Sequence, residues 1–180
     1  MTDEPSAIAL RAMALRDVVR VREWRNLPEI AAYMYSDHEI SEDEHARWFG
    51  NAVSDPTRRY WIIELEGEPV GLANLYDIST DHRRAYWAIY LASPAVRGKG
   101  VGSIAERFVT RHAFQDLDLE KLCCEVLATN TAALKMYKRY GFQVDGTLRR
   151  HVIKSGERVD VVTMSLLRDE WESGRRSLDG

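Results

Sequence analysis

The segment Ser93 to Phe108, "SPAVRGKGVGSIAERF", places three glycines at alternate positions directly after an arginine. Gly98, Gly100 and Gly102 follow Arg97 and precede an amphipathic run. Glycine destabilises a helix interior by about 0.5–1 kcal/mol relative to alanine, so three at a helix start indicate a sharp turn or a close neighbour. Free N–H groups at a helix start bind anions. The segment therefore predicts either a phosphate site or close packing of the helix on a strand.

Two well-known phosphate-binding patterns do not fit this segment. The P-loop needs Gly-x-x-x-x-Gly-Lys followed by Ser or Thr, but Lys99 is followed by Gly100. The dinucleotide fingerprint needs Gly-x-Gly-x-x-Gly, whereas the spacing here is Gly-x-Gly-x-Gly. What remains is a strand that ends near Ser93, a short loop, and a helix with an almost bare first turn.

A carboxylate, Glu125, lies inside the apolar strand pattern "LCCEVL". Burying an ionised carboxylate is costly unless it is paired or has a chemical use. Glu125 is therefore a candidate general base, with a buried ion pair as the structural alternative.

The two cysteines, Cys123 and Cys124, precede this carboxylate directly. Successive strand side chains point to opposite faces, so the pair is a poor candidate for a disulfide. No further Cys or His lies nearby at the spacing of a metal site. We predict that both cysteines are small core residues.

The composition is that of an ordinary globular protein. The chain has 180 residues, 45% of them hydrophobic and 29% charged, with a formal net charge of -3. No basic patch for nucleic acid is expected. Apolar runs fall short of the ~20 residues of a membrane span, and the N-terminus carries acids where a signal peptide carries bases. We expect a cytoplasmic protein with a single domain over residues 1–180 and a core at about 8–168.

The periodicity of the apolar residues predicts the elements that position these groups. Helical patterns occur at 15–26, 40–53, about 101–114 and 130–141. The second begins with Ser41 and Glu44 in a capping-box spacing. Strand patterns occur at 8–13, 60–65, 69–78, 84–93 and 121–127, with two more around 154–158. Strands and helices that alternate around one mixed sheet indicate an α/β (α+β) fold.

Two blocks of the chain together resemble the GCN5-related N-acetyltransferase (GNAT) family. Arg97-x-x-Gly100-x-Gly102 is similar to its pyrophosphate-loop pattern, and Asn130 to Phe142 is similar to its Asn-x-x-Ala-x-x-x-Tyr-x-x-x-Gly-Phe pattern. The element order from Leu10 to Leu166 also follows the family. The resemblance implies a mixed, mostly antiparallel sheet of about seven strands, splayed at an acetyl-coenzyme A cleft and flanked by about four helices.

The resemblance also implies acetyl-coenzyme A as co-substrate and no metal. The backbone of Tyr90 to Ala92 would pair with the pantetheine arm, and the segment from Arg97 to Ser103 would hold the pyrophosphate. Arg97 and Lys99 either add charge there or stay solvated. Asn130 would hydrogen-bond the pantetheine, although a helix N-cap looks the same in sequence. The implied cofactor-binding residues are Tyr90, Leu91, Ala92, Arg97, Gly98, Lys99, Gly100, Val101, Gly102, Ser103 and Asn130.

The same resemblance assigns the chemistry. Amide formation from a thioester needs an unprotonated amine and a proton for the departing thiolate. Tyr137 occupies the family position that points at the coenzyme sulfur and is the candidate acid, with packing as the alternative. Some family members carry a glutamate five residues before the asparagine, where this chain has Glu125.

The N-terminal half resembles acetyltransferases that act on UDP-linked 4-amino sugars in pseudaminic acid biosynthesis. The similar features are Trp24-Arg25-Asn26, Tyr33-Met34-Tyr35 and His45-x-x-Trp48-Phe49. The resemblance implies that Arg25, His45 and Lys154 meet the diphosphate or uracil. It also implies an apolar wall for a 6-deoxy sugar, made of Met34, Tyr35, Trp48 and Tyr86.

Other acceptors and one other class of protein stay open. A ribosomal-protein type acetyltransferase of N-terminal α-amines has a similar layout, whereas polyamines and aminoglycosides call for an acidic pocket. A protein that binds acyl-coenzyme A without turnover is the third reading, although Tyr137 and Glu125 are both present. An exposed strand edge at 159–166 makes a homodimer plausible.

Overall fold

Seven strands form one mixed sheet in the computed structural model, which describes residues 8–96 and 98–176. Along the sheet they are β1 (Ile8–Ala12), β2 (Arg59–Leu65), β3 (Glu68–Ser79), β4 (Arg84–Leu91), β5 (Lys121–Leu127), β7 (Glu157–Leu167) and β6 (Gln143–Lys154). β4 and β5 pair in parallel, and the other neighbours pair antiparallel. The predicted mixed, mostly antiparallel sheet is confirmed.

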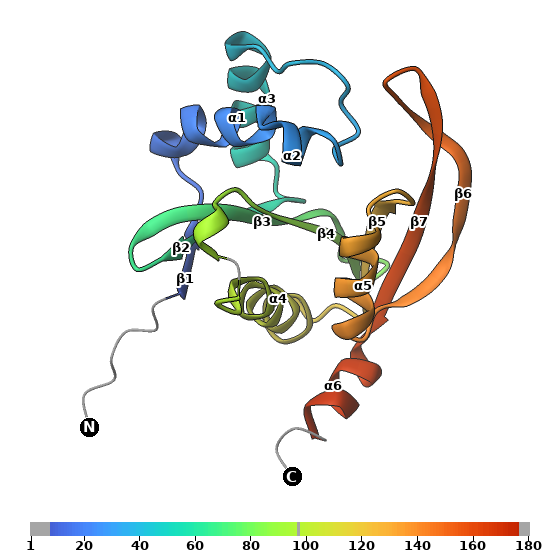
Figure 1. Ribbon diagram of the computed structural model, residues 1–180. Helices are drawn as coiled ribbons and strands as arrows, with labels where there is room; N and C mark the ends of the chain where they lie inside the picture. The colour runs from blue at the N-terminus through green and yellow to red at the C-terminus, as the bar shows by residue number, and fades with distance from the viewer. Residues whose placement is uncertain (1–7, 97, 177–180) are drawn as a thin grey trace.

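Helices cover both faces of this sheet (Figure 1). One face carries α1 (Val18–Asn26), α2 (Pro28–Ala31) and α3 (Glu42–Ser54), and the other carries α4 (Val101–Arg111) and α5 (Thr131–Arg139). α6 (Arg168–Arg176) follows β7. Short 3-10 helices at Leu15–Asp17 and Pro94–Val96 and a short π-helix at His112–Asp116 complete the set.

The sequence patterns missed α2 and α6. α2 has four residues, too few for a periodic pattern, and it starts at Pro28, because proline is favoured in the first helical turn. The predicted start of α3 is confirmed, since the Ser41 hydroxyl accepts a hydrogen bond from the Glu44 N–H at 3.3 Å.

Each face of the sheet has its own apolar core. Alternation along β2 sends Ile63 to the core under α4 and α5, whereas Ile62 packs with Val21 of α1 and Phe49 of α3. Both cysteines are buried and unpaired, as predicted: Cys124 lies in the α4–α5 core. The sheet is therefore packed against helices on both faces.

The pairing of β4 with β5 stops early. It covers Arg84 with Lys121 to Tyr86 with Cys123, yet β4 runs on to Leu91 and β5 to Leu127. The two strands therefore diverge, and the backbone edge of β4 beyond Tyr86 has no partner in β5. This is the splayed sheet that the resemblance implied.

The predicted edge at 159–166 is wrong. Those residues belong to β7, which lies between β5 and β6. The chain turns at Ser155–Gly156 and returns along the inside of β6, so the edge strand is β6. The expected homodimer depended on 159–166 being an exposed edge, so this argument for it no longer holds.

No helix of residues 8–96 and 98–176 is long and apolar enough to cross a membrane. In the same part of the chain, no group of three or more His, Cys, Asp or Glu side chains is placed to hold a metal ion.

Candidate active site

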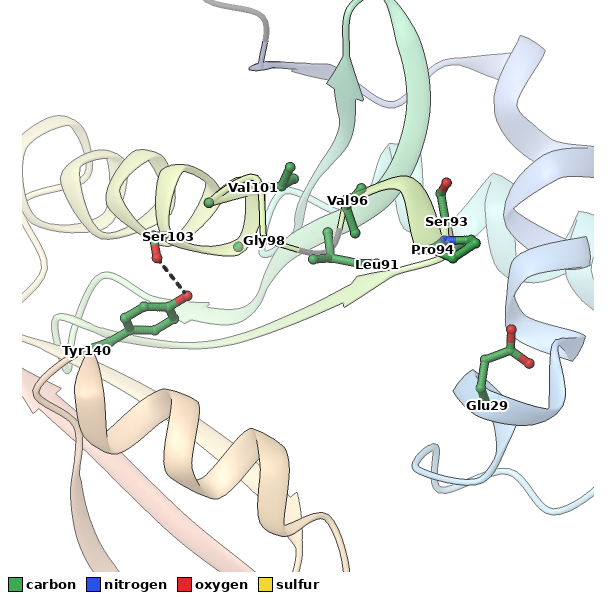
Figure 2. A pocket seen from close by; sticks show the side chains of 12 residues that line it. Glu29, Leu91, Ser93, Pro94, Val96, Gly98, Val101, Ser103 and Tyr140 are labelled. Carbon is green, nitrogen blue, oxygen red and sulfur yellow. Dashed lines mark hydrogen bonds between the residues drawn. The ribbon is translucent and has the colours of Figure 1, made fainter.

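A cavity of about 400 Å³ opens where β4 ends and α4 begins. Ser103 and Tyr140 face each other beside the first turn of α4, and Glu29 of α2 lies on the opposite side (Figure 2). The cavity is lined by Glu29, Leu91, Ala92, Ser93, Pro94, Val96, Gly98, Gly100, Val101, Gly102, Ser103 and Tyr140. Most of the expected cofactor residues are thus brought together. Lys99 is exposed beside the cavity, and Arg97 lies outside the described residues.

The three glycines serve two physical purposes. Gly98 and Gly100 have φ of +74° and +71°, a left-handed conformation that side chains disfavour. A Cβ on Gly102 would instead lie 3.3 Å from the Tyr140 hydroxyl. The first two glycines let the chain turn into α4, and the third lets α4 and α5 approach each other.

The cavity fits the pyrophosphate and pantetheine of coenzyme A. α4 has eleven residues, and its N-cap, Gly100, leaves the first N–H groups uncovered by a side chain. The edge of β4 at Leu91 faces the divergence from β5, because its other edge pairs with Gly71 of β3. An extended amide chain can therefore pair with β4, as the resemblance implied for Tyr90 to Ala92.

Asn130 is the N-cap of α5. Its side-chain oxygen accepts a hydrogen bond from the Ala133 N–H at 3.1 Å. The capping alternative is therefore observed, and the side-chain NH₂ group of Asn130 keeps two donors for the pantetheine.

Tyr137 lies deep in the α4–α5 core, with 5% of its surface exposed. Its ring meets Trp87 edge-on at 5.3 Å between ring centroids and packs on Phe142 at 5.5 Å. Burial raises the pKa of Tyr137 well above the ordinary value, and the neighbouring Cys124 and Tyr76 act in the same direction. The hydroxyl therefore keeps its proton at neutral pH.

Glu125 follows Cys124 in β5, so it lies on the face of the strand that points away from the α4–α5 core. The Tyr35 hydroxyl donates a hydrogen bond to its Oε2 at 2.6 Å. Two further tyrosines stack nearby, Tyr76 of β3 on Tyr86 of β4, at 5.5 Å between centroids. Burial raises the pKa of Tyr76, and the charge of Glu125 raises it further. Glu125 is thus a carboxylate within a group of tyrosines, rather than half of the buried ion pair that was the alternative.

A second group of expected residues gathers between α1, α3 and β4. His45 is buried and stacks on Trp48 at 4.9 Å, and burial lowers the pKa of His45, so its ring is neutral at pH 7. The charge of Arg25 acts on both His45 and Tyr90. Three buried atoms of this group have no hydrogen-bond partner among the described residues: Arg25 Nε, His45 Nε2 and Tyr90 Oη.

The structure divides the expected sugar wall. Tyr35 and Tyr86 lie near Glu125. Trp48 instead packs edge-on against Tyr60 at 5.4 Å, beside His45. Met34 is partly buried in the segment that leads to Tyr35.

Lys154 differs from its expected role. Its ammonium donates to the carbonyls of Ala31 at 3.0 Å and Ser36 at 2.8 Å, and it pairs with Asp37 at 3.2 Å. An ammonium has three N–H donors, and all three have acceptors here. Lys154 is therefore engaged within the protein instead of being free for a diphosphate.

Three site residues were missed by sequence reasoning. Tyr140 follows Tyr137 by three positions, and this helical spacing is a signal that could have been used. Tyr76 lies near Glu125 through the register of β3 with β4. His151, in a bulge of β6, meets the Tyr35 ring at 6.3 Å between centroids, so neither residue had a local signal.

Residues 8–143 match the family described as "Acetyltransferase (GNAT) domain". Spermidine N(1)-acetyltransferase of Escherichia coli K12 is 27% identical over 169 residues, which cover 93% of this chain and 90% of that protein. Acetyltransferase PseH of Campylobacter jejuni is 27% identical over 129 residues, covering 72% of this chain and 78% of PseH.

Solved structures give the same result. The crystal structure of spermidine N-acetyltransferase from Vibrio cholerae in complex with CoA and spermine superposes with a TM-score of 0.85 at 25% identity, covering 93% of this chain and 99% of that one. The family match runs from β1 into β6, across the elements that build the cofactor cavity. This chain therefore belongs to the GNAT family and is an acetyl-coenzyme A-dependent N-acetyltransferase of small-molecule amines.

Proposed function

We propose that the acceptor is the 4-amino group of a UDP-linked amino-deoxy sugar. The observation that carries this proposal is the group of Arg25, His45 and Tyr90, whose buried atoms have no hydrogen-bond partner among the described residues. Buried polar atoms are nearly always hydrogen-bonded. Three such atoms without a partner in one group of residues therefore favour a polar ligand that would pair with them.

The chemistry of this group suits a nucleotide. Arg25 carries the positive charge that a diphosphate needs. His45 is neutral, since burial lowers its pKa, and it suits a neutral uracil or ribose group. Trp24 meets Tyr90 edge-on at 6.4 Å between centroids, which adds aromatic surface.

The spacing between the two groups suits a long substrate. Tyr86, beside Glu125, and Tyr90, beside Arg25, share one face of β4, and four residues at ~3.3 Å each separate them by about 13 Å. A sugar amine at Glu125 would therefore leave room for a diphosphate and nucleoside to reach the Arg25 group.

Two residues supply the proton transfers. Bound acetyl-coenzyme A supplies a thioester, whose C–S bond breaks as the C–N bond forms. Glu125 accepts the proton that the amine loses, directly or through a water. Tyr137 holds a proton in the core between the strands and helices, and gives it to the departing thiolate.

Spermidine is the second candidate, because the spermidine acetyltransferases are similar to this chain over a larger share of its length than PseH. A polyamine carries several positive charges and needs unpaired carboxylates. Asp37 pairs with Lys154, Asp77 pairs with Arg84 at 3.1 Å, and Asp160 accepts from the Arg150 N–H at 2.6 Å. Asp37 and Asp77 are thus neutralised by cations of the protein itself, which favours the nucleotide sugar over a polyamine at these two positions.

The test is a thiol-release assay with acetyl-coenzyme A and a panel of amines. A UDP-4-amino-4,6-dideoxy sugar should be acetylated at least about tenfold faster than the free sugar, because binding of the UDP group orients the amine. UDP alone should compete, and Arg25→Ala should weaken that competition. Turnover of spermidine or a peptide amine without inhibition by UDP would contradict the nucleotide-sugar proposal.

A further inference from the structure

The tip of the β6–β7 hairpin is fastened to the segment that follows α2. Lys154 Nζ pairs with Asp37 Oδ1 at 3.2 Å, and the Ser155 N–H donates to Asp37 Oδ2 at 2.7 Å. Lys154 also donates to the carbonyls of Ala31 and Ser36. We call these contacts the clasp. They join segments separated by 117 (154 − 37) to 123 residues.

The hairpin turn presents these donors. Ser155 and Gly156 have φ of +50° and +81°, the left-handed pair of a two-residue type I′ turn. Only 13% of the Lys154 side chain is exposed, so water competes weakly for its ammonium. Both oxygens of Asp37 are used, and the hydrogen bond from Ser155 and then the pair with Lys154 lower the pKa of Asp37. The clasp is therefore intact at neutral pH.

Tyr35 lies directly beside the clasp. It precedes Ser36 and Asp37, and its hydroxyl reaches Glu125 Oε2 at 2.6 Å. On its other side, the ring meets His151 edge-on at 6.3 Å between centroids. His151 belongs to the β6 bulge between Leu148 and Val152. The hairpin thus borders Tyr35 through His151 and through the clasp.

We propose that Lys154 and Asp37 are positioning residues for catalysis: the clasp holds Tyr35 on Glu125. Tyr35 then occupies Oε2 of the carboxylate and leaves Oε1 for the acceptor amine. Tyr35 lies in a segment without regular structure and is 45% exposed, so holding its hydroxyl on Glu125 costs conformational entropy that a fixed backbone reduces. The clasp binds Ser36 and Asp37, the two residues that follow Tyr35, and so holds the backbone next to Tyr35 in place. This inference rests on the proposed role of Glu125 as the base.

The test is a double-mutant cycle on kcat with Lys154→Met and Tyr35→Phe. Lys154→Met keeps the length of the side chain and removes its donors, and Tyr35→Phe removes only the hydroxyl. Each should lower kcat about tenfold at saturating substrates, with unchanged acetyl-coenzyme A affinity. The double variant should lose no more than either single variant, because both changes break the same contact.

The cycle uses the UDP-4-amino-4,6-dideoxy sugar as acceptor, or spermidine if only spermidine is turned over, so that the acceptor proposal can fail separately. Lys154→Arg should recover most of the rate, because an arginine can reach the same acceptors. Lys135→Met, an exposed lysine of α5, should leave kcat unchanged. Asp37→Asn tests the clasp from the other side if Lys154→Met does not fold.

Two results would overturn the proposal. If the losses in the double variant multiply, Lys154 acts independently of Tyr35. If the single variants raise the acceptor KM while kcat stays at the wild-type value, the clasp shapes the acceptor site only and does not position the base.

Discussion

Tyr137→Phe separates catalysis by the tyrosine hydroxyl from packing by its ring. The ring lies between Trp87 and Phe142 at centroid distances of 5.3 and 5.5 Å, and phenylalanine keeps both contacts. The variant removes only the hydroxyl from a side chain that is 5% exposed. Its free energy of unfolding should therefore change by no more than about 1 kcal/mol.

The effect on the rate should be much larger. General acids contribute about 10²- to 10⁴-fold, and we expect kcat to fall about 10²-fold, equivalent to ~2.7 kcal/mol. Because burial raises the pKa of Tyr137, the hydroxyl stays protonated through neutral pH. The wild-type rate should thus show no loss up to about pH 10 from ionisation of this group.

The assay is thiol release at saturating acetyl-coenzyme A, with titration calorimetry for its affinity and urea unfolding for stability. Tyr140→Phe provides a contrast three residues further along the chain. It loses the 3.3 Å contact with the Ser103 hydroxyl in the cofactor cavity, so its main effect should be weaker acetyl-coenzyme A binding. Near-normal kcat in a folded Tyr137→Phe variant would refute the acid role and leave the tyrosine as a packing residue.

Three further predictions concern the base, the loop and the fold. Glu125→Gln should lower kcat about 10²-fold with little change in acetyl-coenzyme A affinity, and a variant with most of its activity would assign proton removal to another group. Gly100→Val should raise the acetyl-coenzyme A dissociation constant at least about tenfold by calorimetry, because φ is +71° there and a side chain would cover the helix N-terminus; unchanged affinity would exclude the site. Asp17→Ala should lower the free energy of unfolding by about 2 kcal/mol, since the buried carboxylate accepts from Arg11 at 2.7 Å and from the Ala14 N–H at 2.8 Å, while Arg11 keeps its pair with Glu64; urea unfolding at pH 7 measures this. Burial alone would raise the pKa of Asp17, but Arg11 and the Ala14 N–H lower it below 3.8, so this stabilisation is present above that pH and is lost as pH falls through the folded pKa.

Local sequence signals predicted the elements of this protein and its cofactor site. Ser41 starts α3, Gly98 and Gly100 turn the chain into α4, and Asn130 caps α5. Each of these features depends on residues within a few positions of one another, through backbone conformation or a cap. The patterns could not detect α2, which is too short, and they placed the sheet edge on β7, because strand order is not a local property.

Contacts between distant segments decided the surroundings of Glu125. The sequence alone gives no partner for the Lys154 ammonium, which donates to the Ser36 carbonyl 118 residues away. The Tyr35 hydroxyl likewise donates to Glu125, 90 residues away. Tyr76 joins Glu125 only through the register of β3 with β4. The sequence by itself determined the glycine-rich helix start and the tyrosine-bearing helix, and through the family resemblance it predicted an acetyl-coenzyme A site there. Only the tertiary structure decided which side chains gather around Glu125, since strand register, hairpin turn and loop closure bring them together and no local pattern encodes those distances.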